Sequence, residues 1–186
     1  MAKRSSKPPV MPRRPEQTFV REVGDEIFVQ IGKCIAQWSD IEHVIEQVIW
    51  ALLRLNIEEG RIVTSHLDAR HKTLLLRQLG HLHLPSEDME EFTTVLGRIE
   101  DLYERRNLIA HGQWVTLKPD NVPGVMSLRE KLPDGTPRNE VITTVIPQSG
   151  FIDLCQNMGI VYNYLVELRK YASALHNKRS AQPRLE

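Results

Sequence analysis

The sequence predicts a mainly α-helical protein, an antiparallel helical bundle with a small inserted β-hairpin or three-strand meander. Apolar residues recur three and four positions apart along three long stretches, which is the spacing of one helix face. Residues 113–147 differ, because short β-prone runs alternate there with turns rich in Pro, Gly, Asn and Asp. The chain of 186 residues fits one domain. We expect a disordered basic, proline-rich lead at 1–15, a helical domain at 16–176 and a disordered tail at 177–186.

Charge is balanced over the whole chain, with 24 basic and 24 acidic residues. The first 14 residues hold five basic and no acidic side chains, and the last 18 hold five basic and one acidic, so the body between them, with 14 basic and 23 acidic residues, is acidic. A domain of this charge has no general electrostatic attraction for nucleic acid. A local basic patch or the two tails would have to supply the contacts to an RNA.

The two cysteines, Cys34 and Cys155, are far apart in the sequence and stand among apolar helical positions. This pattern favours buried free thiols in a reducing cytosol over a disulfide or a metal site. No run approaches 18 apolar residues, so we expect no transmembrane span and no membrane partner. The proline-rich start lacks the apolar core of a signal peptide, and we expect a cytoplasmic protein.

The first long helix is predicted from about Glu16 to Leu55. Its apolar seam keeps the three-and-four spacing from Val20 to Leu55, with no Pro or Gly after Gly32. An apolar face this wide is more than one partner helix covers. The helix is therefore the centre of the bundle, a dimer seam, or both.

The remaining elements are predicted from the same signals. Ser86 follows a Leu-Pro break and precedes several acidic residues, so it is the expected N-cap of the next long helix, which ends at His111. Ser149 is the expected cap of the last helix. The other expected segments are helices at 58–66 and 69–82 and strands at 113–117, 125–130 and 139–146.

The end of the helix at His111 carries an unusual set of polar residues. Its apolar stripe passes through Leu102 and Ile109, and Arg106 occupies a position on that stripe. A guanidinium there needs an anionic or hydrogen-bonding partner, because burying it unpaired is costly. Asn107 and His111 are four residues apart and lie on one side of the last turn. Gly112 is the expected C′ residue that ends the helix.

This pattern, Arg106-Asn107-x-x-x-His111-Gly112, resembles the R-x4-H signature of the HEPN superfamily. HEPN proteins are small, all-helical proteins common in prokaryotic toxin–antitoxin and abortive-infection systems. Trp114 and the earlier Trp38-Ser39-x-x-Glu42 also resemble that family, and the resemblance covers residues 16 to 175.

The resemblance implies a homodimer with a composite active site at its interface, which cleaves RNA without a metal and leaves a 2′,3′-cyclic phosphate. Arg106, His111 and Asn107 would be the catalytic residues, and an antitoxin protein would be a partner. Family members paired with a nucleotidyltransferase antitoxin often carry a Tyr two residues after the His. Gln113 occupies that position here, which speaks against regulation by nucleotide attachment.

The residue types suit RNA cleavage. An imidazole can act as acid or base near neutral pH, and an Arg fork matches the geometry of a phosphate. One His is not enough for both proton transfers, whereas a two-fold dimer would supply two. Glu42 would hold Arg106 by an ion pair if the first helix passes close to it. Arg105 would be a solvated residue that supplements phosphate binding, and Tyr103 would belong to the core.

Two other functions fit the same residues. The chain could be a non-catalytic helical module that binds a nucleotide or a partner protein in the same cleft, or a purely structural dimerisation protein. We expect no cofactor, because phosphate-binding glycine loops are absent from the sequence. We also expect no metal, because His81 and His83, two apart on a helix, point in different directions.

Overall fold

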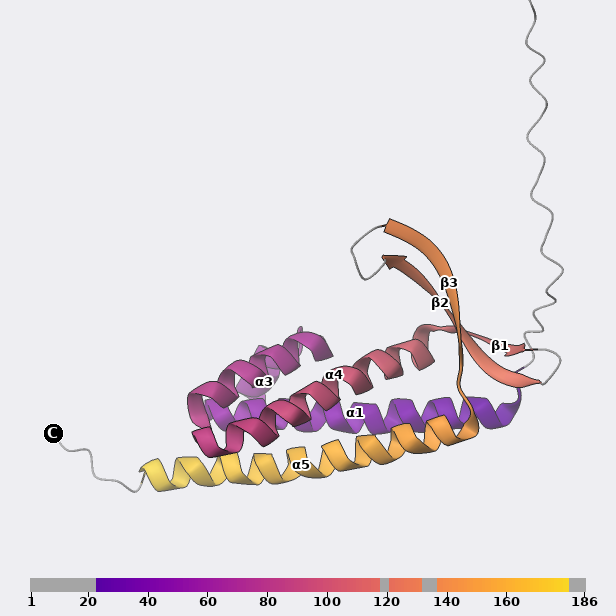
Figure 1. The fold of residues 1–186 in the computed structure, drawn as a ribbon. Helices are drawn as coiled ribbons and strands as arrows, with labels where there is room; N and C mark the ends of the chain where they lie inside the picture. Colours follow the sequence, from indigo (N-terminus) through magenta and orange to yellow (C-terminus); the bar gives the residue numbers. More distant parts are fainter. Residues whose placement is uncertain (1–22, 118–120, 132–136, 181–186) are drawn as a thin grey trace, which may run out of the picture.

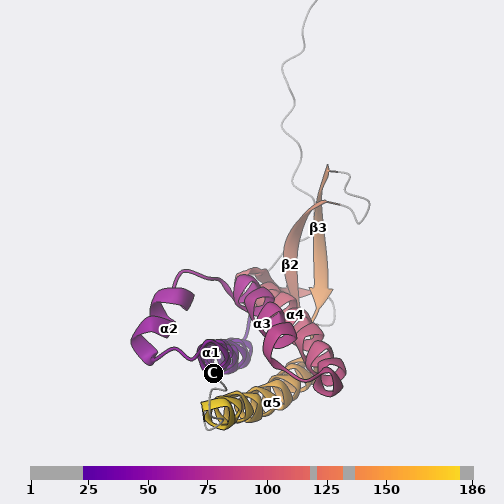
Figure 2. The same cartoon turned by 90° about the vertical axis from the view of Figure 1, so that its left-hand side faces the viewer.

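One helix, α1 (Asp25–Leu53), contacts all four of the other α-helices in the described chain. The computed structural model describes residues 23–117, 121–131 and 137–180. The view along the helices in Figure 2 shows α2, α3 and α5 arranged around α1. The other elements are α2 (Ile57–Thr64), α3 (Ala69–His83), the short 3-10 helix η1 (Ser86–Asp88), α4 (Met89–His111), β1 (Gln113–Leu117), β2 (Val122–Lys131), β3 (Pro137–Val145) and α5 (Gln148–Ser180).

Local sequence signals explain where the first three helices begin and end. Asp25 and Glu26 lie in the first turn of α1, where the helix dipole favours negative charge. Arg54 ends α1 with a left-handed backbone (φ 60°), and its N–H donates to carbonyl groups of the last turn. Asn56 then forms a capping box with Glu59 at the start of α2. The Asp68 side chain accepts from the backbone N–H of His71 and caps α3.

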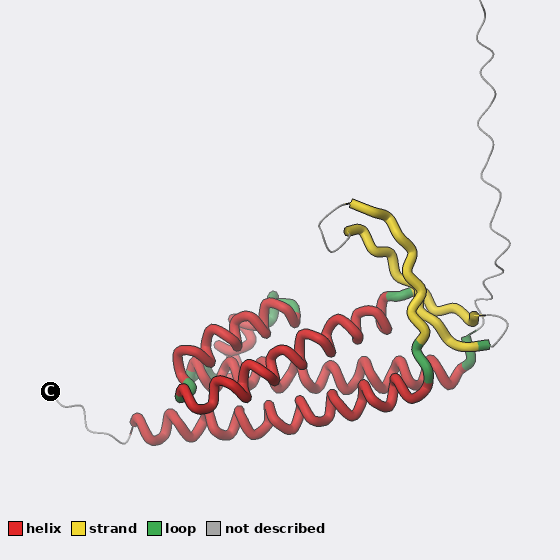
Figure 3. Tube along the Cα trace, viewed as in Figure 1, coloured by secondary structure: helices red, strands yellow, loops and turns green. Residues whose placement is uncertain are grey.

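The three long helices alternate in direction along the chain. Cys34 contacts Cys155, and further along both helices Gln47 accepts a hydrogen bond from Arg169, so α1 and α5 run parallel. Helix α4 runs antiparallel to both, as Figure 1 shows. The predicted antiparallel arrangement is therefore confirmed for α4 against each of the other two, and α1 and α5, the first and third of the series, are parallel as a consequence. The β insertion lies between the end of α4 and the start of α5, at the end of the bundle where α1 begins (Figure 3).

The inserted region forms a three-stranded antiparallel sheet in the order β1-β2-β3. In its register Trp114 faces Val125, and Val125 faces Thr144 on the other side. Val115 and Val125 are fully buried, whereas much of the β2–β3 hairpin projects away from the helices (Figure 1). The prediction of a small three-strand meander is confirmed.

The core follows the apolar seams read from the sequence. Side chains of α1, α4 and α5 at the three-and-four positions are buried together. The most deeply buried large residues are Trp38, Ile41, Ile45, Ile49 and Leu52 of α1, Leu76 of α3, Phe92, Leu96, Ile99 and Leu102 of α4, and Phe151 and Leu154 of α5. Helix α1 is thus the centre of the bundle, which confirms one of the interpretations of its wide apolar seam.

Three predicted boundaries were wrong. Residues 23 and 24 are not helical, so α1 begins at Asp25; its expected start at Glu16 lies outside the described residues. The extended backbone of Gly24 and the cost of glycine inside a helix explain the later start. Ser86 begins η1 instead of capping α4, because the turn after Pro85 is 3-10. Ser149 lies inside α5, which begins at Gln148.

The tails contain two further predictions. Helix α5 continues to Ser180, past the end at 176 that the sequence indicated. The basic lead at 1–15 and the last residues, 181–186, lie outside the described residues. Within the described part of the chain, every helix is too short or too polar to span a bilayer.

Gly112 permits the close approach of the sheet to the end of α4. Its backbone is extended (φ −70°, ψ 153°) and not left-handed, which corrects the expected C′ conformation. A Cβ at this position would lie 2.1 Å from Val125 Cγ2 and 2.5 Å from the Leu108 carbonyl oxygen. The carbonyl is backbone of α4 itself and cannot move aside. Glycine is therefore required by packing and not by a positive φ.

We predict that Gly112→Ala lowers the free energy of unfolding by about 1–3 kcal/mol, because the added methyl group forces a backbone shift. Gly97 of the same helix is the matched control, since a Cβ there meets nothing within 4 Å. Gly97→Ala should raise stability by about 0.5–1 kcal/mol through the lower cost of ordering alanine in a helix. Urea unfolding of both variants measures the difference. Equal stability of Gly112→Ala and the wild type would contradict the packing role.

Candidate functional site

The junction of α4 and β1 is held rigidly by Trp114. Its indole Nε1 donates a hydrogen bond to the Ile109 carbonyl oxygen at 2.9 Å, which satisfies a carbonyl group of the last helical turn. The indole ring stacks on Phe151 of α5, with ring centroids 5.7 Å apart and an interplanar angle of 22°. The end of α4, and with it His111, is therefore fixed against both the sheet and α5.

Arg106 is half-buried on the stripe where an apolar residue was expected. Its Nη1 donates to the Asn107 side-chain oxygen at 3.0 Å. Its Nε is buried and has no hydrogen-bond partner within the described part of the chain. Among the same residues no carboxylate lies within ion-pair distance of Arg106. The guanidinium is thus partly desolvated, oriented by one neutral amide, and not neutralised.

His111 and Asn107 differ in exposure although they share one side of the last turn. His111 is exposed and is the final residue of α4. Asn107 is half-buried, and its side-chain oxygen is occupied by Arg106. The structure therefore gives a partly buried cation and an amide in contact, with an exposed imidazole one turn further along. Within one chain His111 lies on the surface, with Arg106 and Asn107 half-buried beside it.

The expected ion pair between Glu42 and Arg106 is absent from the described residues, and this prediction was wrong for the single chain. Trp38 of α1 contacts Tyr103 of α4, with ring centroids 5.8 Å apart. The two helices are antiparallel. Relative to the contact of Trp38 with Tyr103, Glu42 therefore lies nearer the start of α4 and Arg106 lies nearer its end. At 1.5 Å rise per residue, the two are about 10 Å apart along the helix axes.

The two remaining predicted residues lie as the sequence indicated. Arg105 is 43% exposed and forms an i,i+4 ion pair with Asp101 at 3.8 Å. Such exposed pairs contribute little to stability, so Arg105 keeps its charge available at the surface. Tyr103 is half-buried and packs on the core through Trp38.

Sequence reasoning missed a second buried cation, Lys72 of α3. Its Nζ lies 2.6 Å from the Glu46 carboxylate of α1, and the two side chains are only 11% and 20% exposed. The signal was present, because Lys72 continues the apolar rhythm of Ala69, Leu76 and Leu79. Unlike Arg106, Lys72 has a carboxylate partner inside the chain.

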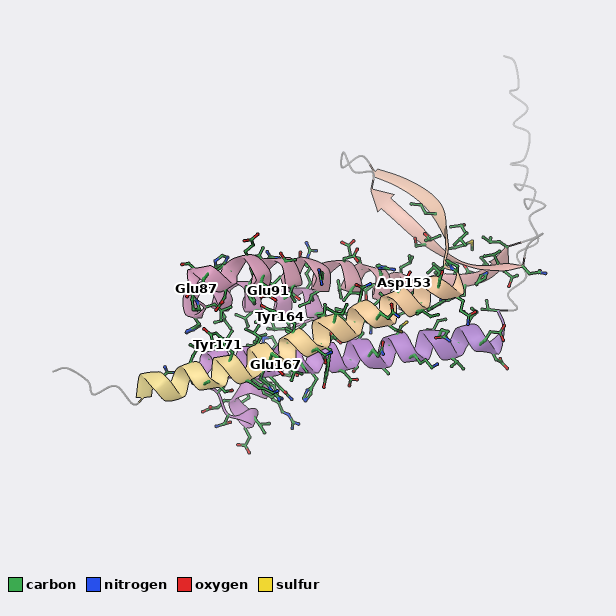
Figure 4. All side chains as sticks on the ribbon, turned by 60° about the horizontal axis from the view of Figure 1, so that its bottom comes forward. Glu87, Glu91, Asp153, Tyr164, Glu167 and Tyr171 are labelled. Carbon is green, nitrogen blue, oxygen red and sulfur yellow. The ribbon has the colours of Figure 1, made fainter. Side chains whose placement is uncertain are left out.

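The described chain also has a cavity of about 230 Å³ between α4 and α5, at the end far from His111. Its walls include Asp88, Glu91 and Glu167, with Tyr164 and Tyr171, and Figure 4 shows Glu91 and Tyr164 where α4 and α5 face each other. Burial, with added repulsion from Glu91 and Asp88, raises the pKa of Tyr164 to about 12. A cavity this acidic repels phosphate, so it is no candidate for RNA binding.

Comparison of the chain with protein-family models, with curated proteins and with solved structures finds no match. Among the described residues, no three His, Cys, Asp or Glu side chains are grouped as metal ligands. The geometry of Arg106, Asn107 and His111 therefore carries the functional assignment.

We predict that Arg106→Met leaves the free energy of unfolding within about 1 kcal/mol of the wild type or raises it, because the cation has no carboxylate partner to lose. Lys72→Met is the matched control and should cost about 3–5 kcal/mol, since it leaves the largely buried Glu46 carboxylate with only the His43 ring, 3.8 Å away, in place of a cation at 2.6 Å. Thermal and urea unfolding measure both variants. If Arg106→Met destabilised the protein as much as Lys72→Met, Arg106 would have a structural role.

The tyrosine cavity predicts a loss of stability at alkaline pH. Because the pKa of Tyr164 is raised from 10.0 to about 12, the folded chain holds the phenol proton more tightly than the unfolded chain. The resulting stabilisation is present below pH 10 and is lost as the pH rises toward 12. Urea unfolding at a series of pH values across this range measures the loss. The free energy of unfolding should fall less with rising pH in Tyr164→Phe than in the wild type, whereas in Tyr162→Phe, at an exposed position, it should fall as in the wild type. An equal fall in Tyr164→Phe and the wild type would contradict the role given to Tyr164.

Proposed function

We propose that this chain is a homodimeric, metal-independent endoribonuclease of toxin–antitoxin or phage-defence type, with a HEPN-like composite site formed by two copies of the α4 end. The observation that carries the proposal is the state of Arg106, which is half-buried, has a buried Nε without a partner in the described chain, and lacks a neutralising carboxylate. A cation in this state is suited to an anion from outside the chain.

The geometry of Arg106 supports phosphate as that anion. Asn107 accepts from one end of the guanidinium, so the fork is held in one orientation. The partly desolvated charge acts in a lower effective dielectric than a surface lysine does, which strengthens its attraction for the phosphoryl oxygens. Arg105, the exposed residue just before Arg106, adds a second positive charge at the same end of α4.

His111 supplies the proton transfer. In RNA cleavage the ribose 2′-oxygen attacks phosphorus, the bond from phosphorus to the 5′-oxygen breaks, and a 2′,3′-cyclic phosphate remains. One group takes the proton of the 2′-hydroxyl, and a second group gives a proton to the leaving 5′-oxygen. His111 is exposed at the helix end and can perform either step.

A second copy of the chain would complete the site. One His111 cannot be acid and base in the same turnover, and in one chain the motif lines none of the four cavities found among the described residues. A two-fold axis beside the end of α4 would bring two His111 and two Arg106 side chains into one cleft. The cleft would exclude water on forming and raise the strength of every charge within it. An antitoxin protein covering this cleft would hold the enzyme inactive.

We predict that the purified chain cuts single-stranded RNA in the presence of EDTA and that His111→Ala lowers the rate by about 10²–10⁴-fold, because a proton-transfer group is lost. His66→Ala is the matched control, since His66 is also exposed but lies between α2 and α3. Gel analysis of labelled RNA measures the rate and the cyclic phosphate end, and light scattering gives the oligomeric state.

The two outcomes divide the proposed functions clearly. Cleavage by His111→Ala at the wild-type rate would remove the catalytic assignment. Calorimetric binding of a nucleotide by the wild type, weakened by Arg106→Met and without any cleavage, would instead identify the non-catalytic binding module.

A further inference from the structure

The only two cysteines of the chain lie side by side. Cys34 of α1 and Cys155 of α5 are 121 positions apart in the sequence, yet their Sγ atoms are 3.5 Å apart. The contact is not incidental to a loose region, because both residues stand in the interface of the parallel helices α1 and α5. Arg169 and Gln47 fix the same register further along these helices. The two thiols are therefore held opposite each other by the fold.

The two thiols differ in accessibility. Cys34 is fully buried, with an exposed fraction of 0%. Cys155 is half-buried and lines a surface groove of about 490 Å³, together with Lys33 and Gln37 of α1 and Gln156 of α5. A small oxidant can enter this groove and reach Cys155, whereas it reaches Cys34 only through Cys155.

The pKa of Cys34 also indicates that it is not the thiol that reacts first with peroxide. Burial, with further contributions from the hydrogen bond and the charge of Cys155, raises the pKa of Cys34 from 9.0 to about 12. Cys34 is therefore protonated at neutral pH and reacts slowly with a peroxide in solution, which leaves it available for a sulfur held in contact with it. The charge of Arg105, near the end of α4, slightly opposes this shift of the Cys34 pKa.

We propose that Cys34 and Cys155 form a peroxide-sensitive dithiol site that closes into a disulfide between α1 and α5. The Cys155 sulfur attacks a peroxide oxygen, the O–O bond breaks, and the products are a sulfenic acid and one water molecule. The Cys34 sulfur then attacks the Cys155 sulfur, the S–O bond breaks, and the leaving hydroxide takes the Cys34 proton to form a second water. Two thiols lose two electrons in total, and one hydrogen peroxide is reduced to two waters.

The geometry requires only a small movement for this step. A disulfide has an S–S length of about 2.05 Å, so the sulfurs must approach by about 1.5 Å from their present contact. The bond would join helices distant in the sequence and restrict the unfolded chain over a long loop, so the oxidised protein should melt at a higher temperature. In a reducing compartment the thiol form dominates, and the disulfide is a transient response to oxidant.

The test treats the full-length protein with hydrogen peroxide and does not depend on any activity toward RNA. Intact mass should fall by two hydrogen atoms, free thiols should fall from two to none, and peptide mapping should join Cys34 to Cys155. The product should remain a monomer-sized band on a non-reducing gel, and a thiol reductant should reverse every change.

Two variants separate the roles of the cysteines. Cys34→Ser should leave Cys155 as a sulfenic acid that dimedone traps, because the second thiol is missing. Cys155→Ser, at the more accessible position, should leave Cys34 reduced as long as the protein stays folded, which circular dichroism checks. If Cys34→Ser fails to fold, the wild type and Cys155→Ser still decide the question.

Several results would overturn the proposal. The first is addition of oxygen to Cys155 while the Cys34 thiol survives, and the second is formation of disulfide-linked dimers through Cys155. The third is that both thiols remain unreacted under conditions in which peroxide oxidises an exposed cysteine of a reference protein. Oxidation of Cys34 in Cys155→Ser at the wild-type rate would also contradict it, because Cys155 would then not be the entry point.

Discussion

The burial of the α1 seam between α4 and α5 is the interaction on which the remaining structure depends. Residues such as Trp38, Ile41 and Ile45 are nearly or fully excluded from water, and no single neighbouring helix could cover them. Because α4 runs antiparallel to α1, it ends where α1 begins, and α5 starts from that same end after the inserted sheet. The parallel arrangement then sets which side chains of α1 and α5 meet, including the two thiols, and the antiparallel α4 carries its last turn to the junction with the sheet.

The two partly buried cations differ in how far the chain itself compensates the cost of removing them from water. Lys72 recovers the cost of leaving water through the Glu46 carboxylate at 2.6 Å. Arg106 recovers less, because within the described residues its guanidinium donates to a neutral amide and its Nε is left without a partner. A phosphate, or the surface of a second copy, would supply what the chain itself does not. This difference is the physical basis of the proposed site.

The distribution of charge along α4 also separates two environments. The helix begins beside an acidic cavity, where burial and the charges of Asp88, Glu91 and Glu87 raise the pKa values of Tyr164 and Tyr171. It ends with Arg105, Arg106 and His111, where cations are favoured by the helix dipole. An RNA strand would therefore be repelled by one end of the bundle and attracted by the other. The balanced total charge of the chain conceals this polarity.

The sequence by itself determined the helical class, the faces of the long helices, the three strands and the polar set at the end of α4. Each of these features depends on the spacing of apolar and polar residues within one segment. The burial of Leu102 and Ile109 on either side of the half-buried Arg106 follows from that spacing. Only the tertiary structure decided the contacts between segments: Glu42 far from Arg106, Lys72 beside Glu46, and Cys34 against Cys155. The direction and register of two packed helices are set by the whole core, so no local pattern of one helix contains them.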